Sequence, residues 1–218
     1  MIAVLTGLRA EAVLVPALRV ACSGGRPARA RLMAETLLAD GAAGLLSFGI
    51  AGGLADGLPP GSVVVGSAVI VGDRSYACDV DWSQALLRSL PTAQYGLVYG
   101  SLQVVAAPEA KQMMHSRSGA LAVDMESGIA AEVCAAAGRP FAVLRAIADP
   151  VGRRIPEAAL VGLTDDGRVD LWPVVSRLVR RPRDLPDLLR VGVDSRAALR
   201  ALRLAVGRLG PSLGFQLA

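Results

Sequence analysis

The sequence predicts an α/β fold with a largely parallel sheet covered on both faces. Short apolar runs alternate with helix-like segments, a pattern typical of parallel strands joined by helices. Several of these runs are continuously apolar and rich in β-branched residues, as expected for strands buried on both sides. The chain has 218 residues, 53% hydrophobic and 19% charged, which is enough for one sizeable core and excludes disorder as its main state.

The predicted elements of the first half are one helix and four strands. The helix covers Pro27–Ala39, because proline is favoured in the first turn of a helix and Gly41 follows its end. The strands are short apolar runs, of which the last two are continuously apolar and therefore predicted to be buried. These strands cover residues 1–6, 18–22, Leu45–Phe48 and Ser62–Val71.

The next stretch continues the alternation up to Pro150. A short helix is predicted over Pro108–Arg117, and an alanine-rich helix over Glu126–Ala137 that Gly138 terminates. The apolar runs around these helices are predicted strands. They cover Leu97–Val105, Leu121–Val123 and Phe141–Ile147.

The character of the chain changes after Asp149 and Pro150. Arginine- and leucine-rich helices are predicted over Leu171–Arg181 and Asp184–Leu209. In the second, one apolar face is expected from Leu188, Leu189, Val191, Val193, Leu199, Leu202, Val206 and Leu209. This pattern favours a surface helix docked on the sheet; a helix touching a membrane surface or an apolar ligand is the alternative. We expect one domain over 1–218, with a body of residues 1–150 and a basic helical extension of residues 151–218 packed on it.

The positive charge belongs to this extension. The net charge of +4 comes from 22 arginines and one lysine against 19 acidic residues. Residues 1–150 hold 11 basic and 12 acidic side chains, whereas residues 151–218 hold 12 and 7. Nucleic-acid-binding domains more often have a basic face with interleaved aromatics, and this chain has only 8 aromatic residues. Nucleic acid is therefore not an expected partner.

The cysteines and the apolar segments indicate a cytoplasmic protein without a membrane span. Cys22, Cys78 and Cys134 lie far apart in the sequence and form no CxxC pair, and the chain has only one histidine. This argues against a disulfide framework and against a zinc site. The first residues have no basic region typical of a signal peptide. The apolar stretch 41–72 is broken repeatedly by glycine and proline, so it favours buried strands and loops.

Four segments that follow predicted strands contain groups able to bind or react with a ligand, because ligands of open parallel sheets lie outside the carboxyl ends of the strands. The glycine-rich segment 49–53 has the spacing G-x-x-G-G, which is not a phosphate-binding fingerprint, so it is either a tight turn or a place where backbone approaches a ligand. The other three segments contain carboxylates in otherwise apolar surroundings: Glu11, Asp124, Glu126 and Asp149. Helix capping explains one such residue easily, but four at one sheet edge are harder to explain that way. His115 near a helix end and Cys134 on the alanine-rich helix are not expected to be catalytic.

These segments resemble the nucleoside phosphorylase and nucleosidase superfamily, especially its methylthioadenosine/S-adenosylhomocysteine nucleosidase branch, over roughly residues 1–150. The matching pieces are L-R-A-E-A from Leu8, F-G-I-A-G-G-L from Phe48, P-G-S-V-V-V from Pro60, A-V-D-M-E-S from Ala122 and R-A-I-A-D from Arg145. The resemblance implies a three-layer α/β/α sandwich around a mixed, largely parallel central sheet. It also implies a homodimer whose partner could complete the pocket, and a catalytic body that needs no metal or cofactor.

The resemblance implies a role for each site residue in cleavage of an N-glycosidic bond. Asp149 would protonate the departing purine at N7, and Glu11 would orient and deprotonate the attacking water. Glu126 would accept hydrogen bonds from the ribose hydroxyls, with Met125 packing on the sugar. The remaining substrate-binding residues would line the site near the base and the nucleophile: Gly49, Ile50, Ala51, Gly52, Val104, Val105 and Asp124.

Two departures from the family pattern concern the nucleophile and the base. Many members have Ser or Thr where this chain has Ile50, and that hydroxyl helps to hold phosphate or water. An aromatic residue often stacks on the base where Val104 stands. Hydrolysis is therefore favoured slightly over phosphorolysis, in which phosphate would be the co-substrate and Arg26, Arg29 or Arg74 would have to clamp it rather than being solvated.

The tail, with Arg180-Arg181-Pro182, resembles the hopanoid-associated phosphorylase subgroup. This implies adenosylhopane as substrate, in hopanoid biosynthesis. The basic helix of the tail indicates in addition a contact with the inner face of the membrane, where a very apolar substrate resides. The alternatives are a purine nucleoside phosphorylase giving a ribose 1-phosphate, a methylthioadenosine/S-adenosylhomocysteine nucleosidase, and a nucleoside-binding or membrane-surface module without turnover.

Overall fold

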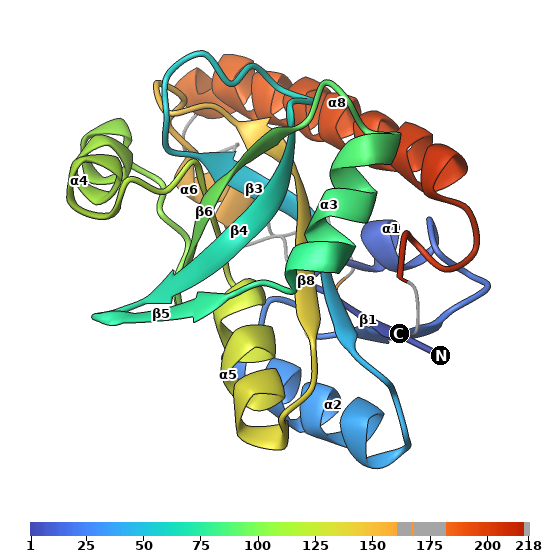
Figure 1. The fold of residues 1–218 in the computed structure, drawn as a ribbon. Coiled ribbons are helices and arrows are strands. Elements are labelled where there is room, and N and C mark those ends of the chain that lie inside the picture. The colour runs from blue at the N-terminus through green and yellow to red at the C-terminus, as the bar shows by residue number, and fades with distance from the viewer. Residues whose placement is uncertain (161–166, 168–181, 216–218) are drawn as a thin grey trace.

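A computed structural model describes residues 1–160, 167 and 182–215 (Figure 1). The strands are β1 (Ala3–Thr6), β2 (Arg19–Cys22), β3 (Leu45–Gly53), β4 (Val63–Val71), β5 (Arg74–Ala77), β6 (Gln94–Gly100), β7 (Ala122–Asp124) and β8 (Phe141–Asp149). The helices are α1 (Arg9–Ala12), α2 (Pro27–Ala39), α3 (Val80–Ser89), α4 (Pro108–Ser118), α5 (Ser127–Ala137), α6 (Glu157–Leu160) and α8 (Leu185–Leu209), the last preceded by a 3₁₀ turn, η1 (Pro182–Asp184).

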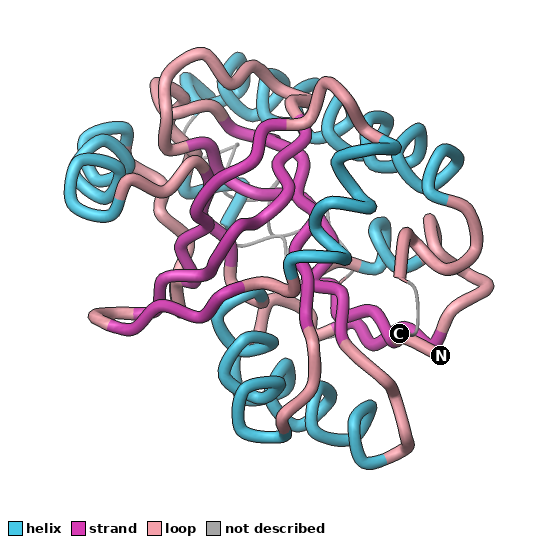
Figure 2. The backbone as a smooth tube through the Cα atoms, in the orientation of Figure 1, coloured by secondary structure: helices cyan, strands magenta, loops and turns pink. Residues whose placement is uncertain are grey.

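The strands form one mixed, largely parallel sheet. Its order is β2-β1-β3-β7-β6-β4-β5, and β8 pairs with both β3 and β4. Strands β3, β8, β4, β6 and β7 therefore form a closed ladder, in which β7 runs antiparallel to β3 but parallel to β6. Figure 2 shows these strands crossing one another at the centre of the molecule, in a strongly twisted sheet. Closure places the three-residue strand β7 alongside the carboxyl end of β3, with Gly53 opposite Ala122.

Helices cover both faces of this sheet, which confirms the predicted α/β/α layers. Helices α2 and α5 lie on one face, and α3 and α8 on the other (Figure 1). Strand β1 shows how the sequence divides between them: Ala3 and Leu5 point into the first core, Ile2 and Val4 into the second. Successive side chains of a strand point to opposite faces, so a continuously apolar run serves both layers.

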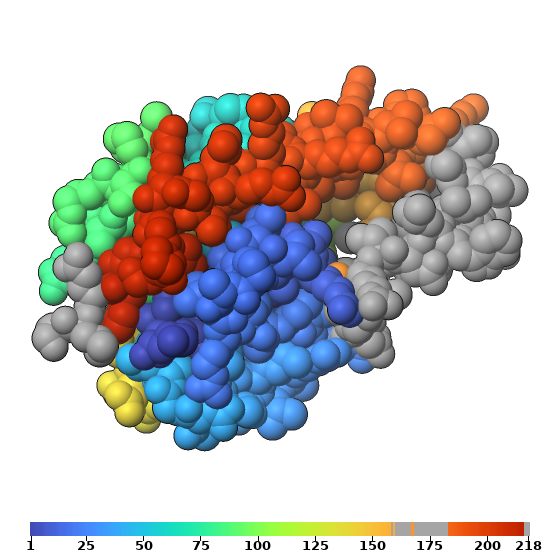
Figure 3. Space-filling view, turned by 90° about the vertical axis from the view of Figure 1, so that its right-hand side faces the viewer, coloured from blue at the N-terminus to red at the C-terminus, as the bar shows by residue number. Residues whose placement is uncertain are grey.

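Helix α8 is part of the second core. Ala198, Leu202, Ala205 and Leu209 are buried, and they share a cluster with β1, β3 and β8 residues such as Phe48. The predicted apolar face was wrong in detail, because Leu189 and Val193 are each 62% exposed and lie on the outer side. Figure 3 shows α8 running along the outside of the molecule, above the N-terminal segments. The predicted helix Leu171–Arg181 lies outside the described residues.

Three predictions about the sheet need correction. Strand β6 ends at Gly100 rather than at Val105, since Ser101 Oγ accepts a hydrogen bond from the Gln103 amide (3.1 Å) and turns the chain into a loop. The segment 49–53 is the end of strand β3 and not a loop or tight turn. The hairpin strand β5 and helix α3 were not predicted; α3 is capped by Asp79, whose carboxylate accepts a hydrogen bond from the Trp82 amide.

None of the described helices is both long enough and apolar enough to cross a membrane.

Candidate active site

The predicted site residues meet around one cavity of about 190 Å³ at the carboxyl ends of β1, β3, β7 and β8. Ten of the eleven line it directly, and Gly49 lies just behind the wall. The lining also includes residues that the sequence did not single out as binding residues: Gly7, Leu8, Gly25, Gln103, Val123 and Ile155. Ile155 comes from the chain after Pro150, so the extension contributes to the cavity.

Glu11 is held by backbone amides from two strand ends. Its Oε2 accepts hydrogen bonds from the amides of Gly7 (2.9 Å) and Leu8 (2.8 Å), which satisfies donors at the start of the short helix α1. Its Oε1 accepts from the Ile50 amide on β3 at 2.8 Å. Burial raises the pKa of Glu11, while Arg145 and these three amides act in the opposite direction. Glu11 is therefore a buried carboxyl with a fixed orientation and a raised proton affinity.

Glu126 lies at the junction between β7 and α5. Ser23 Oγ donates to its Oε1 at 3.0 Å, and the side chain is nearly buried. Burial raises the pKa of Glu126 to about 7; Arg145 lowers it and the neighbouring carboxylates of Asp124 and Glu11 raise it. Glu126 does not cap α5 with its side chain.

Asp124 caps that helix instead. Its Oδ1 accepts from the amides of Glu126 (3.1 Å) and Ser127 (2.8 Å), and its Oδ2 accepts from the Ser127 hydroxyl. This capping fixes the turn that presents Met125 and Glu126 to the cavity. The capping explanation thus holds for Asp124, whereas Glu126 lines the cavity without capping the helix.

Arg145 is a fully buried arginine beneath the cavity floor. Its Nε lies 2.5 Å from Asp124 Oδ2, and its Nη2 donates to Ser47 Oγ at 2.5 Å and lies 3.8 Å from Glu126 Oε2. Its Nη1 has no hydrogen-bond partner among the described residues. Arg145 begins the R-A-I-A-D motif, and no role was predicted for it. A charged residue inside an otherwise apolar strand was the available signal.

Two glycines let the backbone approach these carboxylates closely. A Cβ on Gly49 would lie 2.6 Å from both Glu11 Oε1 and Arg145 Nη1. A Cβ on Gly7 would lie 2.7 Å from Glu126 Oε1. Real Cβ atoms do not come this near, so glycine at these positions is required by packing around Glu11, Arg145 and Glu126.

Asp149 ends strand β8 on another side of the cavity and pairs with Lys111. Its side chain is 14% exposed, and its Oδ2 lies 2.5 Å from Lys111 Nζ. Burial raises the pKa of Asp149, and Lys111 opposes that rise. Lys111 is the single lysine of the chain, and it was not predicted as a site residue.

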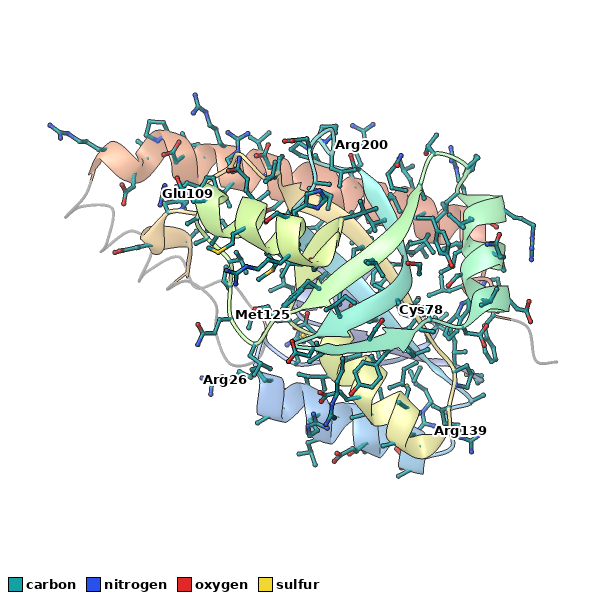
Figure 4. All side chains as sticks on the ribbon, turned by 60° about the vertical axis from the view of Figure 1, so that its left-hand side comes forward. Arg26, Cys78, Glu109, Met125, Arg139 and Arg200 are labelled. Atoms are coloured by element: carbon teal, nitrogen blue, oxygen red, sulfur yellow. The ribbon has the colours of Figure 1, made fainter. Side chains whose placement is uncertain are left out.

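Apolar side chains complete the cavity. Val104 and Val105 come from the loop after β6, and Ile50 from β3. Met125 lies between the start of α2, where Arg26 is found, and α4 (Figure 4). No arginine, lysine or aromatic residue is among the described residues that line the cavity.

Several other candidates lie elsewhere. Arg26, Arg29 and Arg74 do not line the cavity. His115 Nδ1 is 2.8 Å from the Ala120 carbonyl oxygen, and burial raises the pKa of the Cys134 thiol to about 12. In the part of the chain that the structure describes, no cluster of His, Cys, Asp or Glu could hold a metal ion.

The sequence of residues 16–167 matches the family model of the phosphorylase superfamily, well over half of the chain. The chain belongs to the phosphorylase superfamily. Membership places it among enzymes that cleave N-glycosidic bonds, as an N-glycosidase or a nucleoside phosphorylase. A comparison with curated proteins gives no match.

Solved structures share the superfamily fold with this chain at low sequence identity. A putative 5′-methylthioadenosine/S-adenosylhomocysteine nucleosidase from Francisella philomiragia is 20% identical, with a TM-score of 0.70 over 95% of this chain and 97% of that one. The corresponding nucleosidase from Neisseria meningitidis, in complex with methylthio-immucillin-A, is 18% identical, with a TM-score of 0.66 over 94% and 98%. Futalosine hydrolase of Helicobacter pylori is 17% identical, with a TM-score of 0.69 over 94% and 97%.

Proposed function

We propose that the protein hydrolyses the N-glycosidic bond of a 5′-substituted adenosine and releases adenine. The observation that supports this most is the convergence of Glu11, Glu126 and Asp149, from three distant segments, on one largely apolar cavity. Such a reaction passes through an oxocarbenium-like sugar, so it needs an acid on the base, acceptors for the sugar hydroxyls and a base for the nucleophile. Burial raises the pKa of Glu11 and of Asp149, the two groups that would transfer protons, as proton transfer at neutral pH requires.

The assignment of roles follows the position of each carboxyl. Asp149 gives a proton to N7 as the bond between C1′ and N9 breaks, and the electron pair of that bond stays on the purine. Glu126 accepts hydrogen bonds from the 2′- and 3′-hydroxyls, supported by Arg145 beneath it and with Met125 against the sugar. Glu11, fixed by three amides, takes a proton from the water that adds to C1′. The purine lies among Val104, Val105 and the backbone of residues 49–52.

Water is the favoured nucleophile because the cavity offers phosphate no cation. Phosphate binding in proteins relies on arginine, lysine or a run of free amides. The described lining contains neither basic residue type, the Ile50 amide is engaged by Glu11, and Ile50 has no hydroxyl. A phosphorylase that yields a ribose 1-phosphate is the second candidate, supported by the unpartnered Nη1 of Arg145 close to Gly49.

The activity is tested by following adenine release from methylthioadenosine, S-adenosylhomocysteine and adenosylhopane, with and without phosphate. We expect release without phosphate, and a drop of about 10²- to 10⁴-fold in D149N and E11Q. The control is E109Q, which removes an exposed carboxylate (74% exposed side chain) outside the cavity lining and should leave the rate unchanged. Absence of adenine with all three substrates, with wild type and D149N alike, would leave a nucleoside-binding module without turnover.

The same proposal includes adenosylhopane as the natural substrate and a cytoplasmic enzyme that touches the inner face of the membrane. Support comes from the outer stripe of α8, which begins with exposed apolar residues and continues with exposed arginines. The stripe is Leu185, Leu189, Val193, Arg196, Arg200 and Arg203, and Figure 4 labels Arg200 on it. Apolar insertion beside basic residues is the composition that binds anionic lipid surfaces. Sedimentation with anionic vesicles at low salt tests this, and failure to sediment overturns it.

We propose further that residues 1–218 form one domain, with the body over 1–150 and the extension over 151–218, and that two chains form a homodimer. The shared core of α8 with the body supports the first statement. Exposed Leu102 (66%), over a hollow that Met125 also lines, supports the second. Sedimentation equilibrium should give twice the chain mass, and a monomer at micromolar concentration contradicts the dimer.

A further inference from the structure

Lys111 is a buried lysine at the edge of the candidate site. It is the only buried residue of helix α4, and its side chain is 0% exposed. Its Nζ donates to Asp149 Oδ2 at 2.5 Å and lies within 3.0 to 3.2 Å of three backbone oxygens, those of Asp149, Pro150 and Arg153. The donors of the ammonium therefore have acceptors at the end of β8 and on the segment that follows it.

This arrangement is unfavourable for folding unless the charge is needed. A buried ammonium loses its hydration, and an ion pair in a core often stabilises no more than apolar residues of similar volume would. At an ordinary core position of a helix an apolar residue is expected. Helix α4 instead has apolar residues on its exposed side, such as Met113 at 50% exposure, and a lysine at its buried position. A role in the chemistry of Asp149 explains why the one buried position of this helix is a lysine.

We propose that Lys111 is a positioning residue that holds the Asp149 carboxyl toward the purine and stabilises the carboxylate formed when its proton leaves. This inference rests on the proposed function of the site. The O–H bond of Asp149 breaks and the N7–H bond forms, while the electron pair of the C1′–N9 bond goes to the purine. Water adds to C1′ and gives its proton to Glu11; exchange with solvent then returns a proton to Asp149 and removes one from Glu11.

The acid strength of Asp149 depends on charges from three directions. Lys111 on α4 lowers the pKa of Asp149, against the rise caused by burial. Asp194 on α8 raises it, and Arg153 lies between them, with its Nε 2.9 Å from Asp194 Oδ2 and its carbonyl oxygen 3.0 Å from Lys111 Nζ. Neutralising Lys111 and neutralising Asp194 should therefore move the titration of Asp149 in opposite directions.

The experiment compares K111Q, K111M, K111R and D194N with wild type, and M113Q on the exposed side of α4 is the control. Two readouts are used: the basic limb of kcat/KM against pH, and the ¹³C carboxyl signal of Asp149, assigned by its loss in D149N. In K111Q and K111M we expect kcat to fall at least about tenfold, KM to change less than threefold, and both readouts to shift up by about one pH unit or more. D194N should shift them down, and M113Q should change neither.

The outcomes separate positioning from plain structural support. A folded K111Q whose titration of Asp149 equals that of wild type overturns the proposal, as does a K111Q/D149N double variant tenfold slower than D149N alone. K111R keeps the positive charge on a head group of different shape. The basic limb of its kcat/KM profile should therefore stay near that of wild type while kcat falls, and an unchanged kcat in K111R also overturns the proposal. If wild type releases no adenine, the proposed function fails, while the ¹³C titration still decides whether Lys111 sets the proton affinity of Asp149.

Discussion

The Oδ2 atom of Asp124 lies 2.5 Å from Nε of Arg145, with the two side chains 1% and 0% exposed. The ion pair joins the end of β7 to the middle of β8, and the same carboxylate caps α5. Both oxygens of Asp124 already have partners, and its cap positions Glu126, the residue that we propose as the acceptor for the sugar hydroxyls. The pair therefore supports the site from below.

Removing the Asp124–Arg145 ion pair should lower the free energy of unfolding more than removing an ordinary helix cap does. We expect D124A to lower the free energy of unfolding by about 3 to 5 kcal/mol, since it leaves Arg145 buried without its closest counter-charge. The matched variant is D79A, which removes the cap of α3 away from the cavity and should lower it by about 1 kcal/mol with full activity. Urea unfolding measures both, and equal losses in the two variants would contradict the role of the pair.

Gly49 should tolerate no side chain. G49A places a methyl group 2.6 Å from Glu11 Oε1 and Arg145 Nη1, so either group must move and adenine release should fall by at least about 10²-fold. G207A is the control, because nothing lies within 4 Å of a Cβ at that helix position. It should be fully active and slightly more stable, by about 0.5 to 1 kcal/mol. An active G49A would show that the close approach is unnecessary.

Burial of Glu126 should make the folded protein less stable as the pH rises from about 4.5 through 7. The pKa of Glu126 is raised from 4.5 to about 7 on folding, so the folded state binds a proton that the unfolded state has released between these values. Its stability contribution is present below about pH 4.5 and is lost as pH rises through about 7. E126Q should thus gain stability relative to wild type between pH 5 and pH 8, by roughly 3 kcal/mol at most. Thermal unfolding across this range checks it; a constant difference between the two proteins contradicts it.

Helix α8 should be needed for stability of the whole chain. L202A removes a side chain with 0% exposure from the second core and should cost about 2 to 5 kcal/mol. L204A, on the 61% exposed neighbour, should change stability by less than about 0.5 kcal/mol. Both are compared by urea unfolding. Two separate unfolding transitions, with L202A affecting only one of them, would show that the extension folds on its own.

The sequence predicted helices well where proline, glycine or an alanine-rich composition marks them. Helix Pro27–Ala39 is found with those bounds, and the predicted Glu126–Ala137 differs from α5 by one residue. Strand β5 was missed because it has only four residues and is mostly exposed, whereas helix α3 was missed although its buried residues Trp82 and Leu86 have helical spacing. The closed ladder depends on contacts between β3 and β7 that no local pattern indicates.

The candidate site was predictable as far as its carboxylates, because acidic residues in apolar surroundings are conspicuous. Its cations were not. Lys111 lies in the segment E-A-K-Q, which is typical of a solvated helix face, and its burial is visible only once α4 packs against the end of β8. The glycines of β3 were interpreted either as a tight turn or as a place where backbone approaches a ligand. The structural reason for Gly49, the space taken by Glu11 and Arg145, comes from other segments of the chain.

The most direct test is adenine release from a 5′-substituted adenosine in phosphate-free buffer made with H₂¹⁸O. We predict free adenine together with a sugar that has ¹⁸O at C1′, and loss of both products in D149N. Release that requires phosphate and yields a ribose 1-phosphate would contradict water as the nucleophile, and no release under either condition would contradict catalysis by Glu11, Glu126 and Asp149.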